Sequence, residues 1–461
     1  MSGLSADAAF IGGGGASYPG AFELARAGLK VVMVDDKGVL GGECLYSGCV
    51  PSKALRSWAL RYSDAVSLGS RLDPDEVWSR AVSEKDRVQS QVFSQLRWLS
   101  EQLRDNLTVL TGWATIRGPN ELEVSLRDGG TVRVSFRYLH VGAGSTSVVP
   151  DIPGKELAVT SEGLYSYSRT PRELPDSVAI VGGGYIGVEA AEVLSRFGVK
   201  VTLVEMMDRL LPGLPMDLSR AALRLLQGLG VEVKLGYAAS SISRRGDSKV
   251  LRAVGRDGSA FEVAADEVIM AVGRRPRLQG YGLEALGLEL DGGIRVSPGM
   301  RTSVYNVFAA GDVTGRLMLY HAAMRGSLVA AKNMLEGRDA YRMSYRDVPA
   351  VIYTYPEMGY VGYTEEELKS MGVKYEVVRY SMKGNSYSLI EGHPETWVKV
   401  IVDESGSVLG AQAFALEAHS ILTAIAMAMG SGLNYERLYW LAAPHPSPME
   451  SIPEAFRQLS G

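Results

Sequence analysis

Apolar and polar positions follow one another in a repeated order along the first part of the chain. "DAAFIGGGGAS" (7–17) is a short apolar run that ends in a glycine turn, and "LKVVMVDD" (29–36) is a second apolar run. "SVAIVGGGYIGVEAAEVLSRFGVKVTLVE" (177–205) repeats this order with an amphipathic helical stretch between its two apolar runs. A buried strand, a glycine turn, a helix and another strand are typical of a βαβ unit. The pattern therefore predicts two such units.

Other segments extend these units and then depart from them. A polar amphipathic helix is predicted over residues 79–106. From about residue 346, short alternating strands precede an apolar helix at 421–432, which is typical of a separate α+β domain. Residues 108–124 and 138–145 are predicted to form a β-meander that returns to the first sheet. Residues 267–278 are predicted to form a strand that leaves the second unit, and residues 304–315 one more buried strand with a polar end.

Composition narrows the class of protein. The chain has 461 residues, 46% of them hydrophobic and 22% charged, and its net charge of −4 gives no reason to expect nucleic acid as a partner. No apolar run reaches the roughly 18–20 residues of a membrane span, so we expect no membrane association. The first residues lack the features of a secretory signal, and two cysteines do not make a disulfide scaffold. A reducing, cytoplasmic location is expected.

The second glycine turn has the full G-x-G-x-x-G spacing at Gly182, Gly184 and Gly187, and its unit ends with Glu205. Such a loop lets backbone N–H groups approach a pyrophosphate at a helix N-terminus. An acid at the end of the second strand accepts hydrogen bonds from ribose hydroxyls and repels a 2′-phosphate. This unit therefore predicts a dinucleotide site that favours NAD(H) over NADP(H).

The first glycine turn is less regular. Gly12 and Gly14 fit the spacing, and Asp35 supplies the acid, but Ser17 stands at the third position and Pro19 follows it. One such loop could be a chance glycine turn, whereas two loops in matching contexts argue against chance. Two dinucleotides are therefore predicted, one a bound flavin and the other a nicotinamide.

Both cysteines of the chain lie in one short segment, "GGECLYSGCVPSK" (41–53). They could be buried thiols that pack as small apolar groups, or metal ligands, although no further Cys or His lies nearby in sequence. A redox disulfide fits best. Pro51 suits the first turn of a helix, which places Cys49 near a helix N-terminus, where a thiolate is stabilised. Lys53 then lies on the same helix face as Cys49.

The extended segment "GGECLYSGCVPSKAL" (41–55) resembles the active-site segment of the FAD-dependent pyridine nucleotide–disulfide oxidoreductases. The resemblance covers essentially the whole chain. "VGGGYIGVE" (181–189) is similar to the family's second dinucleotide loop, and "AVGRRP" (271–276) is similar to its exit strand. "VFAAGDVTG" (307–315) is similar to its second FAD contact, and "YTYPEMGYVGYTEEE" (353–367) to the start of its dimerisation domain. "HPSPMES" (445–451) is similar to its C-terminal H-P-T-x-x-E motif.

The resemblance implies a fold and a domain order. The fold class is α/β, with two Rossmann-like dinucleotide-binding domains and a C-terminal α+β dimerisation domain. The expected order is a first FAD-binding part, an NAD-binding domain, a second FAD-binding part and the dimerisation domain: residues 1–148, 149–272, 273–345 and 346–461.

The resemblance also assigns catalytic roles. Cys49 would be the flavin-side thiolate, and Cys44 the interchange thiol that exchanges with the substrate disulfide. His445 would be the base for the substrate thiol, oriented by Glu450. In the family this pair comes from the partner subunit, so a homodimer is expected.

Further residues are implied at the cofactors. Lys53 would lie near the flavin, paired with Glu189, and Asp312 would bind the ribityl chain. The other implied cofactor contacts are Gly42, Ala114, Gly144 and Gly273.

Several positions depart from the commonest family pattern. Glu43 stands where threonine is usual, which would place a carboxylate near the flavin pyrophosphate. Ser17 and Pro19 alter the first loop. Ala443 stands where a second histidine is common, and Ser447 replaces the threonine of the C-terminal motif.

The sequence therefore predicts an FAD-dependent, NAD(H)-linked disulfide oxidoreductase, closest in motif to the dihydrolipoamide dehydrogenases. Mercuric reductases are an alternative, although the chain lacks a C-terminal cysteine pair. Glutathione reductases are disfavoured by Glu205, and another disulfide or quinone reductase of the family remains open. The intact motifs argue against a flavoprotein subunit without turnover. The expected partner is a small or carrier-bound dithiol or disulfide, with a 2-oxoacid dehydrogenase complex as a candidate assembly.

Overall fold

The computed structural model describes residues 3–460 as two compact units. Unit 1 contains the chain up to Pro150, together with Val159–Leu174 and Gly273–Ser344. Unit 2 contains Asp151–Ala158, Pro175–Val272 and the chain from Tyr345 onward. The predicted fold class, two Rossmann-like domains and a C-terminal α+β domain, is confirmed. The finer domain boundaries stay predictions.

The main sheet of unit 1 contains six strands: β1 (Gly3–Ile11), β2 (Val31–Asp35), β3 (Leu107–Gly118), β4 (Glu121–Leu126), β5 (Thr131–Val141) and β16 (Val307–Ala309). A parallel layer runs in the order β3, β2, β1, β5, β16. β4 pairs antiparallel with β3 and β5, which forms the predicted meander. All five residues of β2 are buried, as expected for a central parallel strand covered on both faces.

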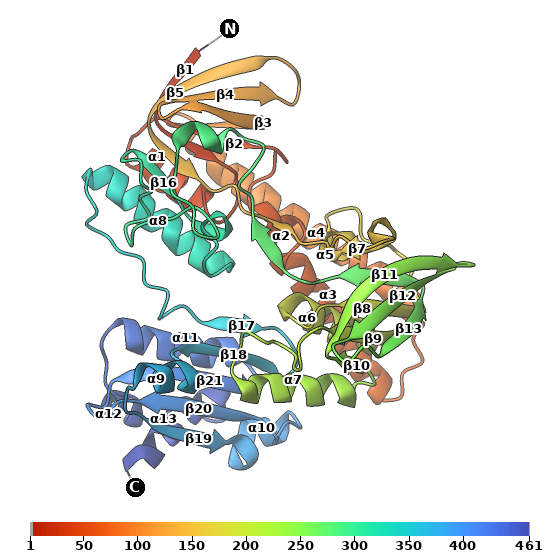
Figure 1. Cartoon of the computed structure of the whole chain (residues 1–461). Helices are drawn as coiled ribbons and strands as arrows, with labels where there is room; N and C mark the ends of the chain where they lie inside the picture. Colours follow the sequence, from red (N-terminus) through yellow and green to blue (C-terminus); the bar gives the residue numbers. More distant parts are fainter. Residues whose placement is uncertain (1–2, 461) are drawn as a thin grey trace. The chain divides into compact units, whose positions relative to one another are not determined.

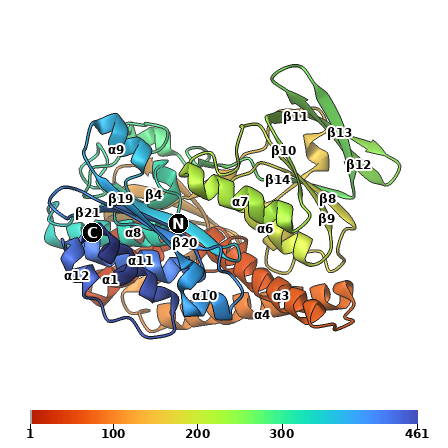
Figure 2. The same cartoon turned by 90° about the horizontal axis from the view of Figure 1, so that it is seen from below.

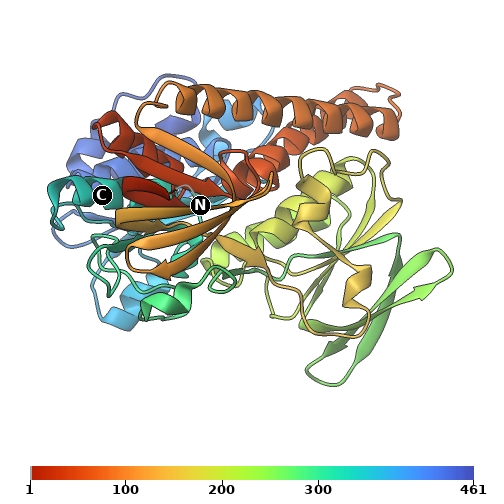
Figure 3. The ribbon, with the colours of Figure 1, turned by 90° about the horizontal axis from the view of Figure 1, so that it is seen from above.

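The helices of unit 1 are α1 (Tyr18–Arg26), α2 (Gly42–Tyr46), α3 (Cys49–Ser67), α4 (Pro74–Glu101), α5 (Ser161–Tyr165) and α8 (Tyr320–Glu336). α1 and α8 pack against each other beside the sheet (Figure 1). α3 and α4 are the two long helices that lie side by side in red-orange and orange in Figure 3. α4 is the predicted amphipathic helix, and it begins after Asp73, whose side chain accepts the Asp75 N–H at 2.9 Å.

Small elements complete unit 1. β6 (Ser145–Ser147) pairs antiparallel with β15 (Arg274–Pro276), and β7 (Val159–Thr160) precedes α5. Two 3₁₀ turns, Leu283–Leu286 and Gly311–Thr314, lie on either side of β16.

The first part of unit 2 holds β8 (Ser177–Val181), α6 (Tyr185–Arg196), β9 (Lys200–Glu205), α7 (Met216–Gly228), β10 (Glu232–Leu235), β11 (Tyr237–Arg245), β12 (Ser248–Gly255), β13 (Ala260–Ala265) and β14 (Glu267–Met270). β10, β9, β8 and β14 form a parallel sheet in that order. The strand order is that of a dinucleotide-binding half. β11, β12 and β13 form an antiparallel sheet that the sequence analysis did not predict.

The C-terminal part of unit 2 is the predicted α+β region. Its strands are β17 (Ala350–Ile352), β18 (Glu357–Gly362), β19 (Glu376–Ser381), β20 (Trp397–Val402) and β21 (Val408–Ala415). Its helices are α9 (Glu365–Met371), α10 (Ser386–Ile390), α11 (Ala418–Gly430), α12 (Tyr435–Tyr439) and α13 (Ser451–Arg457). The strands form one antiparallel sheet in the order β17, β18, β21, β20, β19. α11 lies against this sheet (Figure 2), and Ile421, Leu422 and Ile425 on its apolar face belong to the core of this region.

Within residues 3–460 no helix is both long and apolar enough to cross a membrane.

Candidate functional site

The first glycine loop lies at the carboxyl end of β1, where ligands of parallel sheets bind. Gly12 has a φ of 93°, and a Cβ there would lie 2.5 Å from the Gly142 carbonyl oxygen, so only glycine fits. Asp35, at the end of β2, accepts the Gly13 N–H at 2.8 Å. It also accepts the Lys37 and Gly38 N–H groups, each at 3.0 Å. Burial raises the pKa of Asp35, and the charge of Asp36 adds to this shift against the three backbone hydrogen bonds.

The second loop repeats this arrangement in unit 2. Gly182 has a φ of 108°, and a Cβ there would lie 2.4 Å from the Ala271 carbonyl oxygen. Glu205, at the end of β9, accepts the Gly183 N–H at 2.6 Å and the Met207 N–H at 2.8 Å. A Cβ at Gly184 would meet no atom within 4 Å, so the second glycine faces open space at the start of α6. The predicted acids, Asp35 and Glu205, therefore each accept a hydrogen bond from the backbone of the glycine loop in the same unit, and each loop fits a dinucleotide.

The third position differs between the two loops. A Cβ at Gly187 would lie 1.9 Å from the Gly182 carbonyl oxygen, so the second loop needs glycine there. In the first loop Ser17 is fully buried, and its Oγ donates to the Ile11 carbonyl at 3.4 Å. Gly142 leaves room for that hydroxyl, because a Cβ at 142 would lie 2.1 Å from it. The departure at Ser17 is thus accommodated by a glycine in the facing strand end.

The cysteine segment touches the first loop. Gly41 donates its N–H to the Gly13 carbonyl at 2.9 Å. A Cβ at Gly42, which has a φ of 60°, would lie 2.6 Å from the Cα of Gly14. These backbone contacts place the start of α2, with Cys44, directly beside the candidate flavin loop.

The two cysteines lie at adjoining helix ends. Cys44 is in α2, and Cys49 is the first residue of α3, as the position of Pro51 predicted. Both are in the thiol form and are not joined in a disulfide, with Cys44 partly buried and Cys49 exposed. A hydrogen bond with the Cys49 side chain, together with burial and the charge of Cys49, raises the pKa of Cys44. Cys49 lies at the N-terminus of α3, a position that stabilises a thiolate.

Glu43 does not face the candidate flavin loop as an isolated charge. Its carboxylate forms an ion pair with Lys37 and accepts a hydrogen bond from Ser47 Oγ. The Lys37 ammonium also lies over the Tyr46 ring, 4.5 Å from its centroid. Although burial acts in the opposite direction, Lys37, Ser47 and the charge of Arg274 lower the pKa of Glu43. The carboxylate that the sequence left unexplained is therefore neutralised locally.

Asp312 is held by residues that the sequence analysis did not single out. Ser145 Oγ donates to Asp312 Oδ2 at 2.6 Å, and Arg274 Nε donates to Ser145 Oγ at 2.8 Å. The Arg274 guanidinium also donates to the Ser145 carbonyl at 3.0 Å. Arg274 lies within the "AVGRRP" segment, and the resemblance of this segment to the family was the sequence signal that could have identified Arg274. This chain of contacts joins β6, β15 and the 3₁₀ turn after β16.

The other predicted cofactor positions are placed in unit 1. Ala114 is buried in β3. Gly144 and Gly273 have φ values of 73° and 118°, and a Cβ at either would meet no atom within 4 Å. Both positions are therefore open and have a backbone conformation that favours glycine, whereas Gly42 is packed against Gly14.

His445 and Glu450 form the predicted pair in unit 2. His445 Nδ1 and Glu450 Oε1 are 2.8 Å apart, and the second Glu450 oxygen accepts the Ser447 N–H at 3.0 Å. Although burial acts in the opposite direction, the Ser447 N–H and His445 lower the pKa of Glu450. The imidazole side chain is 68% exposed, so its other nitrogen is accessible. This geometry suits a base whose ring is oriented by a carboxylate.

Glu189 lies on α6, and its Oε1 accepts the Tyr353 N–H at 2.9 Å. Lys53 lies on α3, one turn after Cys49. The pairing of Lys53 with Glu189 stays a prediction.

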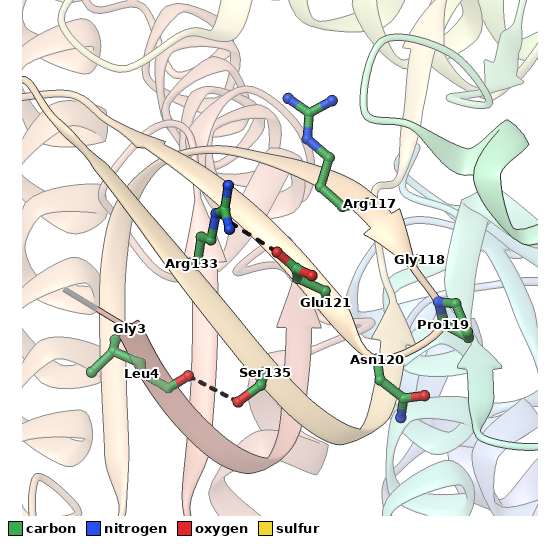
Figure 4. Close-up of a pocket in the computed structure, with 9 residues that line it drawn as sticks. All are labelled: Gly3, Leu4, Arg117, Gly118, Pro119, Asn120, Glu121, Arg133 and Ser135. Atoms are coloured by element: carbon green, nitrogen blue, oxygen red, sulfur yellow. Dashed lines mark hydrogen bonds and ion pairs between the residues drawn. The ribbon is translucent and has the colours of Figure 1, made fainter. Parts of the chain in front are cut away.

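Two other features are separate from this chemistry. Among residues 3–460 no three Cys, His, Asp or Glu side chains are grouped to hold a metal ion. A groove of about 480 Å³ lies at the amino end of β1 and beside the β3–β4 turn (Figure 4). Ligands of parallel sheets bind at the carboxyl ends, so this groove is not the dinucleotide site. Arg133 in the groove faces Glu121 at 3.8 Å.

Comparison with known proteins decides the family. Residues 6–327 match the pyridine nucleotide-disulphide oxidoreductase family model, and residues 348–456 match the dimerisation domain of the same family. The chain belongs to the pyridine nucleotide–disulfide oxidoreductase family. It is therefore an oxidoreductase that uses FAD and a nicotinamide dinucleotide, as the two loops predicted.

Relatives of this oxidoreductase match over nearly their full lengths. The dihydrolipoyl dehydrogenase of Halobacterium salinarum is 33% identical over 461 residues, covering 99% of this chain and 96% of the relative. The dihydrolipoyl dehydrogenase of Bacillus subtilis is 32% identical, covering 98% of each chain.

Solved structures agree with the fold. RclA of Escherichia coli, a HOCl-induced flavoprotein disulfide reductase, matches with a TM-score of 0.87 and 26% identity over 99% of each chain. LpdA of Mycobacterium tuberculosis matches with a TM-score of 0.86 over the whole of both chains, at 23% identity, and supports the fold alone.

Proposed function

We propose that this oxidoreductase is a dihydrolipoyl dehydrogenase, which oxidises a dihydrolipoyl dithiol and reduces NAD⁺. The observation that carries the proposal is the hydrogen-bonded pair of Cys44 in α2 and Cys49 at the start of α3, directly beside the first glycine loop. The names of the full-length relatives support the choice of substrate.

In the proposed reaction the two cysteines act in turn. A substrate thiolate attacks Cys44 of the Cys44–Cys49 disulfide, forms a mixed disulfide with it and releases Cys49 as a thiolate. The second thiol of the substrate then attacks the substrate sulfur that is bonded to Cys44. This step releases Cys44, and the substrate leaves as a cyclic disulfide. His445, oriented by Glu450, accepts the proton of the substrate thiol. FAD, when bound, supplies the two-electron chemistry between the cysteine pair and NAD⁺.

Residues around the cofactors have proposed binding roles. Asp35 and Asp312 would hold FAD, with Lys53 and Glu189 near its reactive end. Glu205 would bind the adenosine ribose of NAD(H). Because a carboxylate repels a 2′-phosphate, NAD(H) is the proposed nicotinamide.

We further propose that the protein is a cytoplasmic homodimer and that His445 of each subunit serves the cysteines of the other. The family's dimerisation domain at residues 348–456 and the exposed His445 support this arrangement.

Mixing Cys44→Ser and His445→Ala subunits would then restore one intact site in each heterodimer, giving roughly a quarter of wild-type activity for random exchange. Verified heterodimers without any recovery would contradict the shared site. Association with a 2-oxoacid dehydrogenase complex is the corresponding proposal for a larger assembly.

A substrate comparison tests the function. Purified holoenzyme is assayed for NAD⁺ reduction with dihydrolipoamide and, in parallel, for NADH oxidation with lipoamide, oxidised glutathione and a quinone. The proposal predicts the highest kcat/KM for the dihydrolipoamide–lipoamide couple. Turnover of glutathione or quinone with inert lipoamide would assign the protein to another reductase of the family.

A further inference from the structure

A buried polar pair lies on α4, and one of its members, Gln89, contacts the segment between the two cysteines. Lys85 and Gln89 are each 0% exposed, although they lie on a largely polar helix. The Lys85 ammonium donates to Asp86 Oδ1 at 2.6 Å, to Gln89 Oε1 at 3.0 Å and to the Ser166 carbonyl at 3.1 Å. Asp86 also accepts the Ser168 N–H at 3.0 Å. All three N–H groups of the lysine are used, which fixes its position.

Lys85 determines how the Gln89 amide is oriented. An ammonium group can only donate hydrogen bonds, so the amide oxygen of Gln89 faces Lys85 and the amide nitrogen faces away from it. That nitrogen donates to the Leu45 carbonyl at 2.8 Å and to the Tyr46 carbonyl at 2.8 Å. The Tyr167 N–H donates to the same Tyr46 carbonyl at 2.9 Å.

The two carbonyl groups belong to the last two residues of α2, directly before the turn that leads to Cys49. α2 ends at Tyr46 and α3 begins at Cys49, so Ser47 and Gly48 alone lie between the helices. The last carbonyls of a helix have no partner within it. Here Gln89 and Tyr167 supply the missing donors from outside the turn. A disulfide tolerates a narrow range of Cα separations, so the path of this turn decides how well the sulfurs meet.

We propose that Gln89, oriented by Lys85, is a positioning residue that sets how readily the Cys44–Cys49 disulfide closes. The inference rests on the proposed function, in which the pair alternates between dithiol and disulfide. Closure forms one S–S bond from two thiols and releases two electrons and two protons. A turn held in place keeps the sulfurs at high effective concentration and favours the disulfide. A loosened turn shifts the equilibrium toward the dithiol.

Equilibration with glutathione tests this positioning. Holoenzyme is equilibrated under nitrogen with mixtures of reduced and oxidised glutathione, in which oxidised glutathione accepts the two electrons. Free thiols are then alkylated and counted by mass spectrometry. Gln89→Glu keeps the side-chain size and an acceptor for Lys85 but removes both donors to the turn. We expect the equilibrium constant for closing the disulfide to fall about tenfold in this variant. This corresponds to a reduction potential about 30 mV less negative.

Gln91→Glu is the matched control. It makes the same chemical change on the exposed face of α4, where Gln91 accepts a hydrogen bond from Arg87 at 3.0 Å. We expect the wild-type constant for Gln91→Glu, and for Gln89→Met a decrease like that of Gln89→Glu, because methionine removes the donors without adding a charge.

Three results would overturn the inference: an unchanged constant in a folded Gln89 variant, an equal change in Gln91→Glu, or failure of both Gln89 variants to fold, since the proposed effect is local to the turn. A wild-type protein that forms no disulfide in any glutathione mixture would instead contradict the proposed function, so the two failures are distinguishable.

Discussion

The hydroxyl of Ser17 occupies the space that a side chain at residue 142 would need, because a Cβ at Gly142 would lie 2.1 Å from Ser17 Oγ. In the second loop the equivalent crowding lies within the loop, where a Cβ at Gly187 would lie 1.9 Å from the Gly182 carbonyl oxygen. The first loop thus keeps the close helix–strand approach of a dinucleotide fold but places the required glycine in the facing strand end.

This relationship predicts the behaviour of a double mutant. Gly142→Ala should lower the free energy of unfolding by about 1–3 kcal/mol, because it overpacks a closed site. Ser17→Gly should rescue most of that loss when combined with it, giving a coupling of at least about 1 kcal/mol. Urea unfolding of the wild type, both single variants and the double variant measures the coupling. Additive effects would show that the two residues do not share this space.

The ion pair of Lys37 with Glu43 predicts the flavin affinity of charge variants. Lys37→Met leaves the Glu43 carboxylate without its cation beside the first loop, where phosphates would bind. We expect FAD to bind about tenfold more weakly, which corresponds to about 1.4 kcal/mol. Glu43→Gln should bind FAD at least as well as the wild type, and adding it to Lys37→Met should restore affinity. Fluorescence titration of apoprotein with FAD measures each constant; wild-type affinity in Lys37→Met would contradict the argument.

His140 predicts a specific pH dependence of stability. It is fully buried, its Nε2 contacts the Ala16 carbonyl at 2.6 Å, and burial lowers its pKa to about 4 despite that hydrogen bond. Between pH 6.5 and 4 the unfolded chain binds a proton that the folded chain excludes, so stability falls as the pH falls. The loss from this residue is on the order of 3 kcal/mol across that window.

Urea unfolding at several pH values tests this. The stability advantage of the wild type over His140→Leu should be largest above pH 6.5 and should shrink toward pH 4. A constant difference across the window would show that His140 protonation is not linked to folding.

Glu205 predicts the choice of nicotinamide. Glu205 is 6% exposed, and its two carboxylate oxygens accept hydrogen bonds from the Gly183 N–H at 2.6 Å and the Met207 N–H at 2.8 Å. It therefore cannot turn away from a 2′-phosphate. We expect kcat/KM for NADH to exceed that for NADPH at least about tenfold, one contact of about 1.4 kcal/mol. Glu205→Gln removes the charge and should lower the ratio of kcat/KM for NADH to kcat/KM for NADPH. Equal kcat/KM for the two nucleotides in the wild type would refute the role of Glu205 in selecting NAD(H).

The sequence predicted those features that rest on local pattern. The glycine loops, their acids Asp35 and Glu205, and the start of α3 at Cys49 all follow from spacing, turn chemistry and Pro51. The antiparallel sheet of β11, β12 and β13 was missed; β11 and β13 are mostly exposed or half-exposed, so they carry few of the buried apolar residues that mark a strand in the sequence.

Contacts between distant segments could not be predicted from one sequence. The neutralisation of Glu43 by Lys37, which lies only six positions earlier, depends instead on the path of the loop between them. The Arg274–Ser145–Asp312 chain joins three segments far apart in the sequence. Lys85 and Gln89 appear as ordinary polar residues of an amphipathic helix until folding buries them against the cysteine turn.

The central claim is that electrons pass between the flavin and the substrate through Cys44 and Cys49. Anaerobic stopped-flow absorbance of the Cys44→Ser holoenzyme tests it most directly. Because hydride transfer from NADH does not need Cys44, the flavin absorbance of this variant should still bleach when NADH is added. Because thiol exchange does need Cys44, dihydrolipoamide should produce no NADH from NAD⁺. Wild-type turnover of dihydrolipoamide by Cys44→Ser would contradict the account.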